Sequence, residues 1–284
     1  MERVILVMGG GGMKGLAHAG AWRALVESGL GVTEVVGTSI GALIGACIGS
    51  GMSWPEMEAQ ALALQKTDIV VLNRWALLLN GIRQPSVFRG ETFREYIERV
   101  VPATGFDELS VPVGMNAVDL ETGQEVWFGA GGRANVSVHD AIYASCALPL
   151  FYPPAELDGR LWVDGGVTDP LPVTRAAERG ADLIVAVDVS AGPIKDSKDT
   201  VANGLVAIHH RVYDIMAYER KRALLEAWSG PPLLVVRPTL DGYSTFDFES
   251  TRFFLDEGYR ATRAALESSP LTSSIVARGV DRAG

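Results

Sequence analysis

The sequence predicts an α/β fold in which a mostly parallel sheet has both faces covered by helices. The apolar run at residues 4–8 is continuous, as expected of a strand that is buried on both faces. The chain opens as strand, helix, strand, helix, an order typical of parallel sheets with helical crossovers. With 284 residues, of which 48% are hydrophobic and 21% charged, it is long enough to bury such a core.

The individual elements follow from apolar spacing and from the positions of Gly and Pro. The first helix ends at Gly29, and a short strand at residues 34–38 and a buried helix at residues 40–49 come next. We expect further strands at residues 111–119, 124–128, 160–163, 183–189 and 233–237, and further helices at residues 88–101, 138–147, 205–228 and 248–266. Because no repeat or low-complexity linker interrupts the pattern, we expect one domain over residues 1–284, with its core at about residues 3–268 and a frayed C-terminal tail.

Residues 52–87 are less regular, although residues 69–79 within them are strongly apolar. A core helix or strand is the interpretation that we favour for this stretch. The alternative is an apolar cap over a pocket for an acyl chain.

Composition restricts the partners and the compartment. The formal charge is −9 and no basic tract is present, so we expect no nucleic-acid partner. Cys47 and Cys146 have apolar neighbours and are expected to be reduced, buried thiols of a cytoplasmic protein. We find no signal peptide and no run of about 20 apolar residues. A lipid substrate would therefore be met from the aqueous side, which is compatible with transient membrane-surface contact, and the oligomeric state is not indicated.

The first motif is G-G-G-M-K-G at residues 10–15, which follows a strand and opens a helix. Glycines let backbone N–H groups converge on one point, and a helix N-terminus adds partial positive charge. The loop is therefore predicted to hold a phosphate or an acyl-transfer oxyanion. The same letters fit a dinucleotide fingerprint, which requires an acidic residue at the end of the second strand. Glu34 lies at the start of that strand instead, which weakens the dinucleotide interpretation but leaves it open.

The second motif is G-T-S-I-G at residues 37–41, between a strand and a helix. This is the context of a nucleophile elbow, in which flanking glycines permit a sharp turn and the Ser39 hydroxyl projects above the sheet.

The third motif is D-G-G at residues 164–166, directly after a strand. Asp-Gly alone indicates a turn, but together with the other two motifs Asp164 is interpreted as a general base.

Four histidines must be weighed, since serine hydrolases commonly use one. Ser39, Asp164 and His209 follow the chain order of an α/β-hydrolase triad, but such enzymes reach their nucleophile after several strands, and this chain has only two by then. We therefore interpret His209 and His210 as helix-surface or partly packed residues. His18, on the first helix, is interpreted as a packed polar residue.

The three motifs in this order are the signature of patatin-like phospholipases, and the chain resembles the bacterial, single-domain branch of that family over roughly residues 3–190. The resemblance implies a three-layer α/β sandwich with a central, mostly parallel sheet. It implies a Ser–Asp dyad in which Ser39 is the nucleophile and Asp164 is the base, without catalytic histidine, metal or other cofactor. It implies oxyanion-hole N–H groups at Gly10, Gly11 and Gly12, of which the last two are preferred, and supporting motif positions at Lys14, Gly15, Gly37, Gly41, Gly165 and Gly166.

Relatives in this family hydrolyse phospholipids, lysophospholipids, acylglycerols or generic esters. The resemblance therefore implies a serine acyl-hydrolase that cleaves lipid carboxyl esters through an acyl-enzyme. Burial would raise the pKa of Asp164 and make it a stronger base for the serine hydroxyl. Two other hypotheses stay open: a nucleotide-binding oxidoreductase that uses the glycine loop, and a non-catalytic lipid-binding regulatory protein with the same fold.

Overall fold

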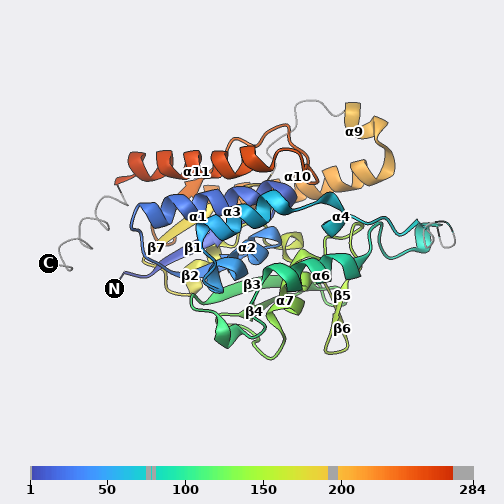
Figure 1. The fold of residues 1–284 in the computed structure, drawn as a ribbon, viewed down its shortest axis with the longest axis horizontal. Coiled ribbons are helices and arrows are strands. Elements are labelled where there is room, and N and C mark those ends of the chain that lie inside the picture. The colour runs from blue at the N-terminus through green and yellow to red at the C-terminus, as the bar shows by residue number, and fades with distance from the viewer. Residues whose placement is uncertain (1, 75–77, 79–80, 191–197, 271–284) are drawn as a thin grey trace.

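The computed structural model describes residues 2–74, 78, 81–190 and 198–270, and it confirms the predicted α/β sandwich (Figure 1). The described strands are β1 (Val4–Met8), β2 (Val32–Gly37), β3 (Val113–Asp119), β4 (Glu125–Gly129), β5 (Ala155–Leu157), β6 (Arg160–Asp164), β7 (Leu183–Val187) and β8 (Leu233–Val236). They form one sheet in the order β5-β6-β3-β2-β1-β7-β8, with β4 paired to β3. The five strands from β3 to β8 along this path are parallel, whereas β4, β5 and β6 pair in antiparallel fashion.

Helices cover both faces of the sheet. The described α-helices are α1 (Ala17–Glu27), α2 (Ile40–Gly49), α3 (Trp54–Ala63), α4 (Lys66–Ile69), α6 (Gly90–Val100), α7 (Val138–Cys146), α8 (Val173–Glu178), α9 (Lys198–Ala202), α10 (Gly204–Glu226) and α11 (Thr251–Ser268). Short 3-10 helices lie at η1 (Gly12–Leu16), η2 (Gly81–Arg83), η3 (Phe106–Glu108) and η4 (Gly165–Val167).

Alternation along β1 shows how the three layers are held together. Leu6 and Met8 belong to the larger hydrophobic core, which also contains residues of α1, α2 and α11. Ile5 and Val7 point to the opposite face and belong to a smaller core with residues of α8 and the C-terminal end of α10. Since successive side chains of a strand point to opposite faces, an all-apolar strand is the sequence pattern that this central position requires.

Several short elements were not predicted from the sequence, and some predicted strand ends differ from those in the structure. β5 has three residues, too few for a periodic pattern, and it joins β6 through a hairpin at Asp158 and Gly159, both of which have positive φ. The helix α3 lies in the stretch described above as irregular, although Ser53 and Glu56 form a capping box at its start. The predicted strand at residues 183–189 ends two residues earlier, at Val187.

The meeting of two strand ends positions the functional site. β2 pairs in parallel with the first half of β3, where Gly37 lies opposite Met115. β6 pairs in antiparallel fashion with the second half of β3, where Asp164 lies opposite Ala117. β4 occupies the other edge of β3 along both halves, so β2 and β6 lie on the same edge and their C-terminal ends point at each other. The residues that follow β2 are thereby brought next to the last residue of β6.

Other sequence predictions have mixed outcomes. Cys47 and Cys146 are both buried and unbonded, as predicted. Among the helices that the structure describes, none is long and apolar enough to cross a membrane. The predicted frayed tail falls mainly on residues 271–284, which lie outside the described residues, and the single-domain organisation stays a prediction.

Candidate active site

Ser39 lies at a strained turn between β2 and α2. Its φ is 55° and its ψ is −125°, a combination that non-glycine residues rarely adopt. The flanking glycines allow the chain to pack this tightly. A Cβ atom at Gly41 would lie 2.1 Å from the carbonyl oxygen of Met8, and one at Gly37 would lie 2.5 Å from the carbonyl oxygen of Gly41. The turn therefore has the geometry that the G-x-S-x-G motif predicted.

The hydroxyl of Ser39 donates a hydrogen bond to Oδ2 of Asp164 at 2.7 Å. The other carboxylate oxygen, Oδ1, accepts the backbone N–H of Gly166 at 2.7 Å. Asp164 is only 1% exposed, and this burial raises its pKa to about 6, against the opposing effect of the two hydrogen bonds. The pair therefore consists of a hydroxyl and a carboxyl group whose proton affinity is well above that of an ordinary aspartate.

One short segment after Asp164 connects all three motifs. The Thr38 hydroxyl donates to the carbonyl oxygen of Asp169 at 3.0 Å, and the Gly10 N–H donates to that of Pro170 at 3.0 Å. Gly165 packs so closely on Asn116 that a Cβ atom there would lie 2.1 Å from its side-chain oxygen. These contacts fix the glycine loop, the serine turn and the aspartate relative to one another.

The glycine loop offers two backbone donors beside the serine. Gly10 is next to Ser39, since a Cβ atom at Gly10 would lie 3.4 Å from the Cβ of Ser39. Its own N–H is already bonded to Pro170, so it is not free to bind an oxyanion. The N–H groups of Gly11 and Gly12 donate to no acceptor among the described residues. The free backbone donors of the loop are therefore those of Gly11 and Gly12, the two preferred glycines, and the oxyanion hole stays a prediction.

A pocket of about 910 Å³, counting its solvent-filled mouth, opens over Ser39 and Asp164. One part of its wall is apolar and includes Ile40, Ile69, Phe93, Leu148, Tyr152 and Phe246. Another part is polar and includes Lys14, Ser190, His210, Tyr213, Asp214 and Thr245. An apolar pocket with a few convergent polar groups is the usual form of a small-molecule site.

The sequence-predicted residues separate into two groups in the structure. Ser39, Asp164, Gly10, Gly11, Gly12, Lys14 and Gly166 line the pocket. Gly15, Gly37, Gly41 and Gly165 lie behind it, where each permits a close backbone or side-chain approach. A Cβ atom at Gly15, for example, would lie 2.2 Å from Cγ2 of Ile40, next to the serine.

Comparison with known proteins agrees with this arrangement of motifs. The sequence profile of patatin-like phospholipases matches residues 6–177. The chain belongs to the patatin-like phospholipase family. The match includes all three motifs, the end of β1, and the whole of β2 and β6.

Two relatives illustrate how far the likeness extends. The uncharacterized NTE family protein Rv1063c of Mycobacterium tuberculosis is 33% identical over 231 residues, which are 79% of this chain and 60% of that protein. Lysophospholipase NTE1 of Candida albicans is 26% identical over 275 residues, which are 87% of this chain and 19% of that protein. The patatin-like chain therefore spans less than two thirds of these relatives. Among solved structures, VipD from Legionella pneumophila has the same fold, with a TM-score of 0.53 and 15% identity over 94% of this chain and 67% of that one.

The pocket wall contributed by α10 was missed at the sequence level. His210, Tyr213, Asp214 and Ala217 all line the pocket of this patatin-like protein. Their spacing of three, four and seven residues places them on one face of a helix. This spacing indicates a polar helix face in the sequence. However, the same pattern is found on the solvent-exposed face of any surface helix, so it does not by itself indicate a pocket.

The histidines make no hydrogen bond to the serine. His18 is fully buried and its Nε2 contacts the carbonyl oxygen of Gly9 at 2.8 Å, and burial lowers its pKa to about 4. His210 is partly packed, as predicted, but it lies in the pocket wall, where its Nε2 contacts the Thr245 hydroxyl at 2.7 Å. His209 is exposed. Among the described residues, the Ser39 hydroxyl donates its hydrogen bond to Asp164. This geometry gives no support to a catalytic triad that includes a histidine.

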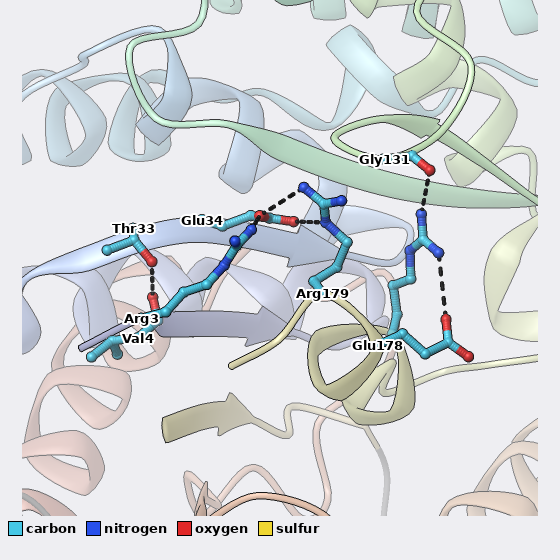
Figure 2. A network of polar contacts seen from close by, with 8 residues as sticks. Arg3, Val4, Thr33, Glu34, Gly131, Glu178 and Arg179 are labelled. Carbon is cyan, nitrogen blue, oxygen red and sulfur yellow. Dashed lines mark hydrogen bonds and ion pairs between the residues drawn. The ribbon is translucent and has the colours of Figure 1, made fainter. Parts of the chain in front are cut away.

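Glu34, the acidic residue relevant to a dinucleotide site, lies far along β2 from the glycine loop. In Figure 2 its carboxylate contacts two guanidinium groups, those of Arg3 at 2.5 Å and Arg179 at 2.7 Å. Glu34 is buried and pairs with Ile5 near the start of β2, whereas the glycine loop follows the opposite end of the neighbouring strand β1. The Glu34 carboxylate is therefore held by two arginines. The dinucleotide fingerprint requires an acidic residue at the end of the second strand, and Glu34 does not lie there.

The apolar stretch at residues 69–79 lies partly against the pocket. Ile69 is buried and lines it, and the Tyr152 hydroxyl donates to the Ile69 carbonyl oxygen at 3.1 Å. Leu72 and Leu78 are exposed. Residues 75–77 and 79–80 lie outside the described residues, so the acyl cap stays a prediction for the rest of the stretch.

Proposed function

We propose that this chain is a serine acyl-hydrolase that cleaves lipid carboxyl esters with Ser39 as nucleophile and Asp164 as general base. The observation that carries the proposal is the 2.7 Å hydrogen bond from the Ser39 hydroxyl to a buried carboxylate, at the floor of a largely apolar pocket. Membership of the patatin-like phospholipase family supports the same activity class.

The reaction begins when the ester carbonyl lies over Ser39. The Ser39 oxygen attacks the carbonyl carbon while its proton passes to Oδ2 of Asp164, and the carbonyl oxygen becomes an oxyanion. The free N–H groups of Gly11 and Gly12 stabilise that oxyanion, an effect typically worth about 3 kcal/mol per donor. Asp164 then returns the proton to the departing alcohol as the carbon–oxygen bond breaks, which leaves an acyl-enzyme.

Water completes the cycle by the same groups. Asp164 removes a proton from a water molecule, the resulting nucleophile attacks the acyl carbon, and the fatty acid leaves as the Ser39 oxygen regains its proton. The raised pKa of Asp164 favours both proton transfers, because a carboxylate with a pKa of about 6 is a stronger base than one near 3.9.

The apolar wall supports a lipid acyl chain as the group that occupies the pocket. Each methylene that moves from water into apolar surroundings contributes about 0.8 kcal/mol. Ile69, Phe93 and Phe246 offer such surroundings in the lining of the pocket. kcat/KM should therefore climb over several carbons in a series of p-nitrophenyl esters from acetyl to palmitoyl. A strict preference for acetyl would contradict the lipid assignment even if Ser39 proved to be the nucleophile.

We further propose that the outer face of α10 makes transient contact with a lipid surface. Leu205 and Met216 are 77% and 63% exposed, and Ile208, Val212 and Ile215 are also exposed along the same helix. The other face of α10 lines the pocket, so a bilayer that met the exposed apolar side chains would lie across this helix from the pocket. A cytoplasmic location stays a prediction from the sequence.

The runner-up hypotheses make different predictions. A nucleotide-binding oxidoreductase would bind NAD(P) tightly and show no esterase activity, but the salt-bridged Glu34 does not favour it. A non-catalytic lipid-binding protein would bind the same lipids without turnover. Hydrolysis of a lysophospholipid or a monoacylglycerol by the wild-type chain, and its loss in Ser39→Ala, distinguishes both from the acyl-hydrolase.

A further inference from the structure

Tyr213 places a hydroxyl group in the pocket beside Asp164. It lies on α10 and lines the pocket together with Ser39 and Asp164. A Cβ atom at Gly166 would lie only 2.5 Å from the Tyr213 hydroxyl oxygen, so this hydroxyl lies against Gly166. Gly166 in turn donates its backbone N–H to Oδ1 of Asp164, the carboxylate oxygen that does not bind Ser39. The phenol therefore lies on the Asp164 side of the pocket.

The Tyr213 hydroxyl differs from the other hydroxyl groups of the pocket wall in its partners. The others are bonded to neighbours: that of Tyr152 to Ile69, that of Ser190 to Asp188 and that of Thr245 to His210. The Tyr213 hydroxyl forms no hydrogen bond with any residue that the structure describes, and its oxygen is not enclosed by protein atoms. Burial and the negative charges of Asp164 and Asp214 raise the pKa of Tyr213, so it stays protonated and can donate a hydrogen bond.

A chain of contacts connects the Tyr213 ring to the glycine loop. The ring lies nearly parallel to that of His210, with the two centroids 6.3 Å apart and an angle of 12° between the planes. His210 contacts the Thr245 hydroxyl through Nε2, and the Thr245 carbonyl oxygen accepts the backbone N–H of Met13 at 2.8 Å. These contacts hold the phenol in a defined place relative to the loop that supplies the proposed oxyanion donors.

The proposed reaction leaves one oxygen atom of the ester without a partner. The carbonyl oxygen becomes the oxyanion and is bound by the N–H groups of Gly11 and Gly12, whereas the Ser39 oxygen forms the new bond to carbon. The oxygen of the departing alcohol must lie within reach of Asp164, because Asp164 gives it a proton as the carbon–oxygen bond breaks. The Tyr213 hydroxyl lies on this side of the pocket, so the departing oxygen is the acceptor that it can meet.

We propose that the Tyr213 hydroxyl donates a hydrogen bond to the leaving-group oxygen of the ester. This inference rests on the proposed function and adds a catalytic residue to it. As the carbon–oxygen bond breaks, Asp164 passes its proton to the departing oxygen, while Tyr213 keeps its own proton and stabilises the negative charge that develops on that oxygen. The size of the contribution therefore depends on the leaving group. A departing alkoxide needs this stabilisation, whereas 4-nitrophenolate is already a stable anion.

The experiment measures kcat/KM for the octanoate esters of 4-nitrophenol, phenol, trifluoroethanol and ethanol, which share an acyl chain and differ in the acidity of the leaving alcohol. Tyr213→Phe removes the hydroxyl and keeps the ring. Its kcat/KM should stay within about twofold of the wild type for the 4-nitrophenyl ester and fall by roughly tenfold for the ethyl ester, with the other two esters between them. The matched control is Tyr218→Phe, which removes a phenol hydroxyl from α10 outside the pocket lining and should match the wild type on all esters.

The pattern across the esters separates a catalytic role from a structural one. Retained hydrolysis of the 4-nitrophenyl ester by Tyr213→Phe shows a folded variant with a working Ser39, so a selective loss with the ethyl ester supports the inference. Unchanged rates with every ester would overturn it, and so would an equal loss with all of them, which a displaced pocket wall would produce. If the wild type hydrolyses none of the esters, the proposed function fails and the inference fails with it.

Discussion

The two sides of the pocket are built in different ways. On the sheet side, Ser39 and Asp164 lie at the meeting ends of β2 and β6, where backbone hydrogen bonds and close glycine contacts fix every neighbour. On the helix side, α10 presents polar residues to the same pocket, yet Lys221 is the one buried residue among its 23. The helix is attached mainly at a few points, such as the contacts of Lys221 with Asp188 and of His210 with Thr245.

This difference separates two tasks of a hydrolase. A proton transfer needs reacting atoms held to within a fraction of an ångström, and rigid elements supply that precision. Contact with a variable head group or a membrane tolerates more movement, and segments with few buried contacts open at lower free-energy cost. Substitutions on the sheet side should therefore affect turnover strongly, and substitutions on α10 should affect selectivity and lipid binding more modestly.

The largest effect should come from removing the base. Asp164→Asn keeps the shape of the side chain but cannot accept the serine proton, so kcat should fall by roughly 10³-fold or more. Steady-state hydrolysis of a soluble p-nitrophenyl ester measures it. The matched control is His209→Ala, which replaces an exposed histidine on α10 and should retain activity. Comparable loss in His209→Ala, with unchanged thermal stability, would restore the triad alternative.

The pH dependence should reveal the same carboxyl group. Because burial raises the pKa of Asp164 to about 6, kcat/KM should rise about tenfold per pH unit below that value and level off above it. His210 also lines the pocket, so His210→Ala serves as the control and should keep the midpoint. A midpoint near 4, or one that disappears in His210→Ala, would show that Asp164 does not control the profile.

Stability should change in the opposite sense to activity. The folded state of the wild type binds the Asp164 proton more tightly than the unfolded state, in which the pKa is near 3.9. The free energy of unfolding should therefore decrease as pH rises from about 4 to 6, by up to about 3 kcal/mol. Asp164→Asn removes the free-energy cost of the buried carboxylate. The free energy of unfolding of this variant should therefore exceed that of the wild type at pH 8, and the difference should disappear at pH 4. Denaturant titrations at the two pH values measure the difference, and a less stable variant at pH 8 would contradict the buried-charge explanation.

The smallest effect should come from the outer face of α10. Replacing Leu205 and Met216 with Ser removes exposed apolar surface, and neither residue lines the pocket. Sedimentation with phosphatidylcholine vesicles should show several-fold weaker binding, while hydrolysis of a soluble ester stays within about twofold of wild type. The matched control is Val26→Ser, which replaces an exposed apolar residue on α1. Equal vesicle binding in all variants would remove α10 from the lipid contact.

The same comparison explains what could be predicted from the sequence. β1, the serine turn and α2 were placed to within two residues, because strands buried on both faces and glycines at close backbone contacts leave strong local patterns. Ser39 and Asp164 are 125 residues apart in the chain, so no local pattern predicts their contact. It was expected from the three motifs taken together and from the family resemblance. The role of α10 could not be predicted, since Tyr213 and Asp214 on a helix have the pattern of any solvated face until the tertiary structure places them over a pocket.

Labelling with an active-site fluorophosphonate tests the central claim most directly. The reagent reacts with an activated serine, and mass spectrometry of the digested protein identifies the modified residue. We expect one label, on the peptide that contains Ser39, with loss of labelling in Ser39→Ala and strong reduction in Asp164→Asn. Ser190→Ala, which removes another hydroxyl from the pocket wall, should label like the wild type. Labelling that persists at full rate in Ser39→Ala would contradict the assignment of Ser39 as the nucleophile and, with it, the proposed reaction.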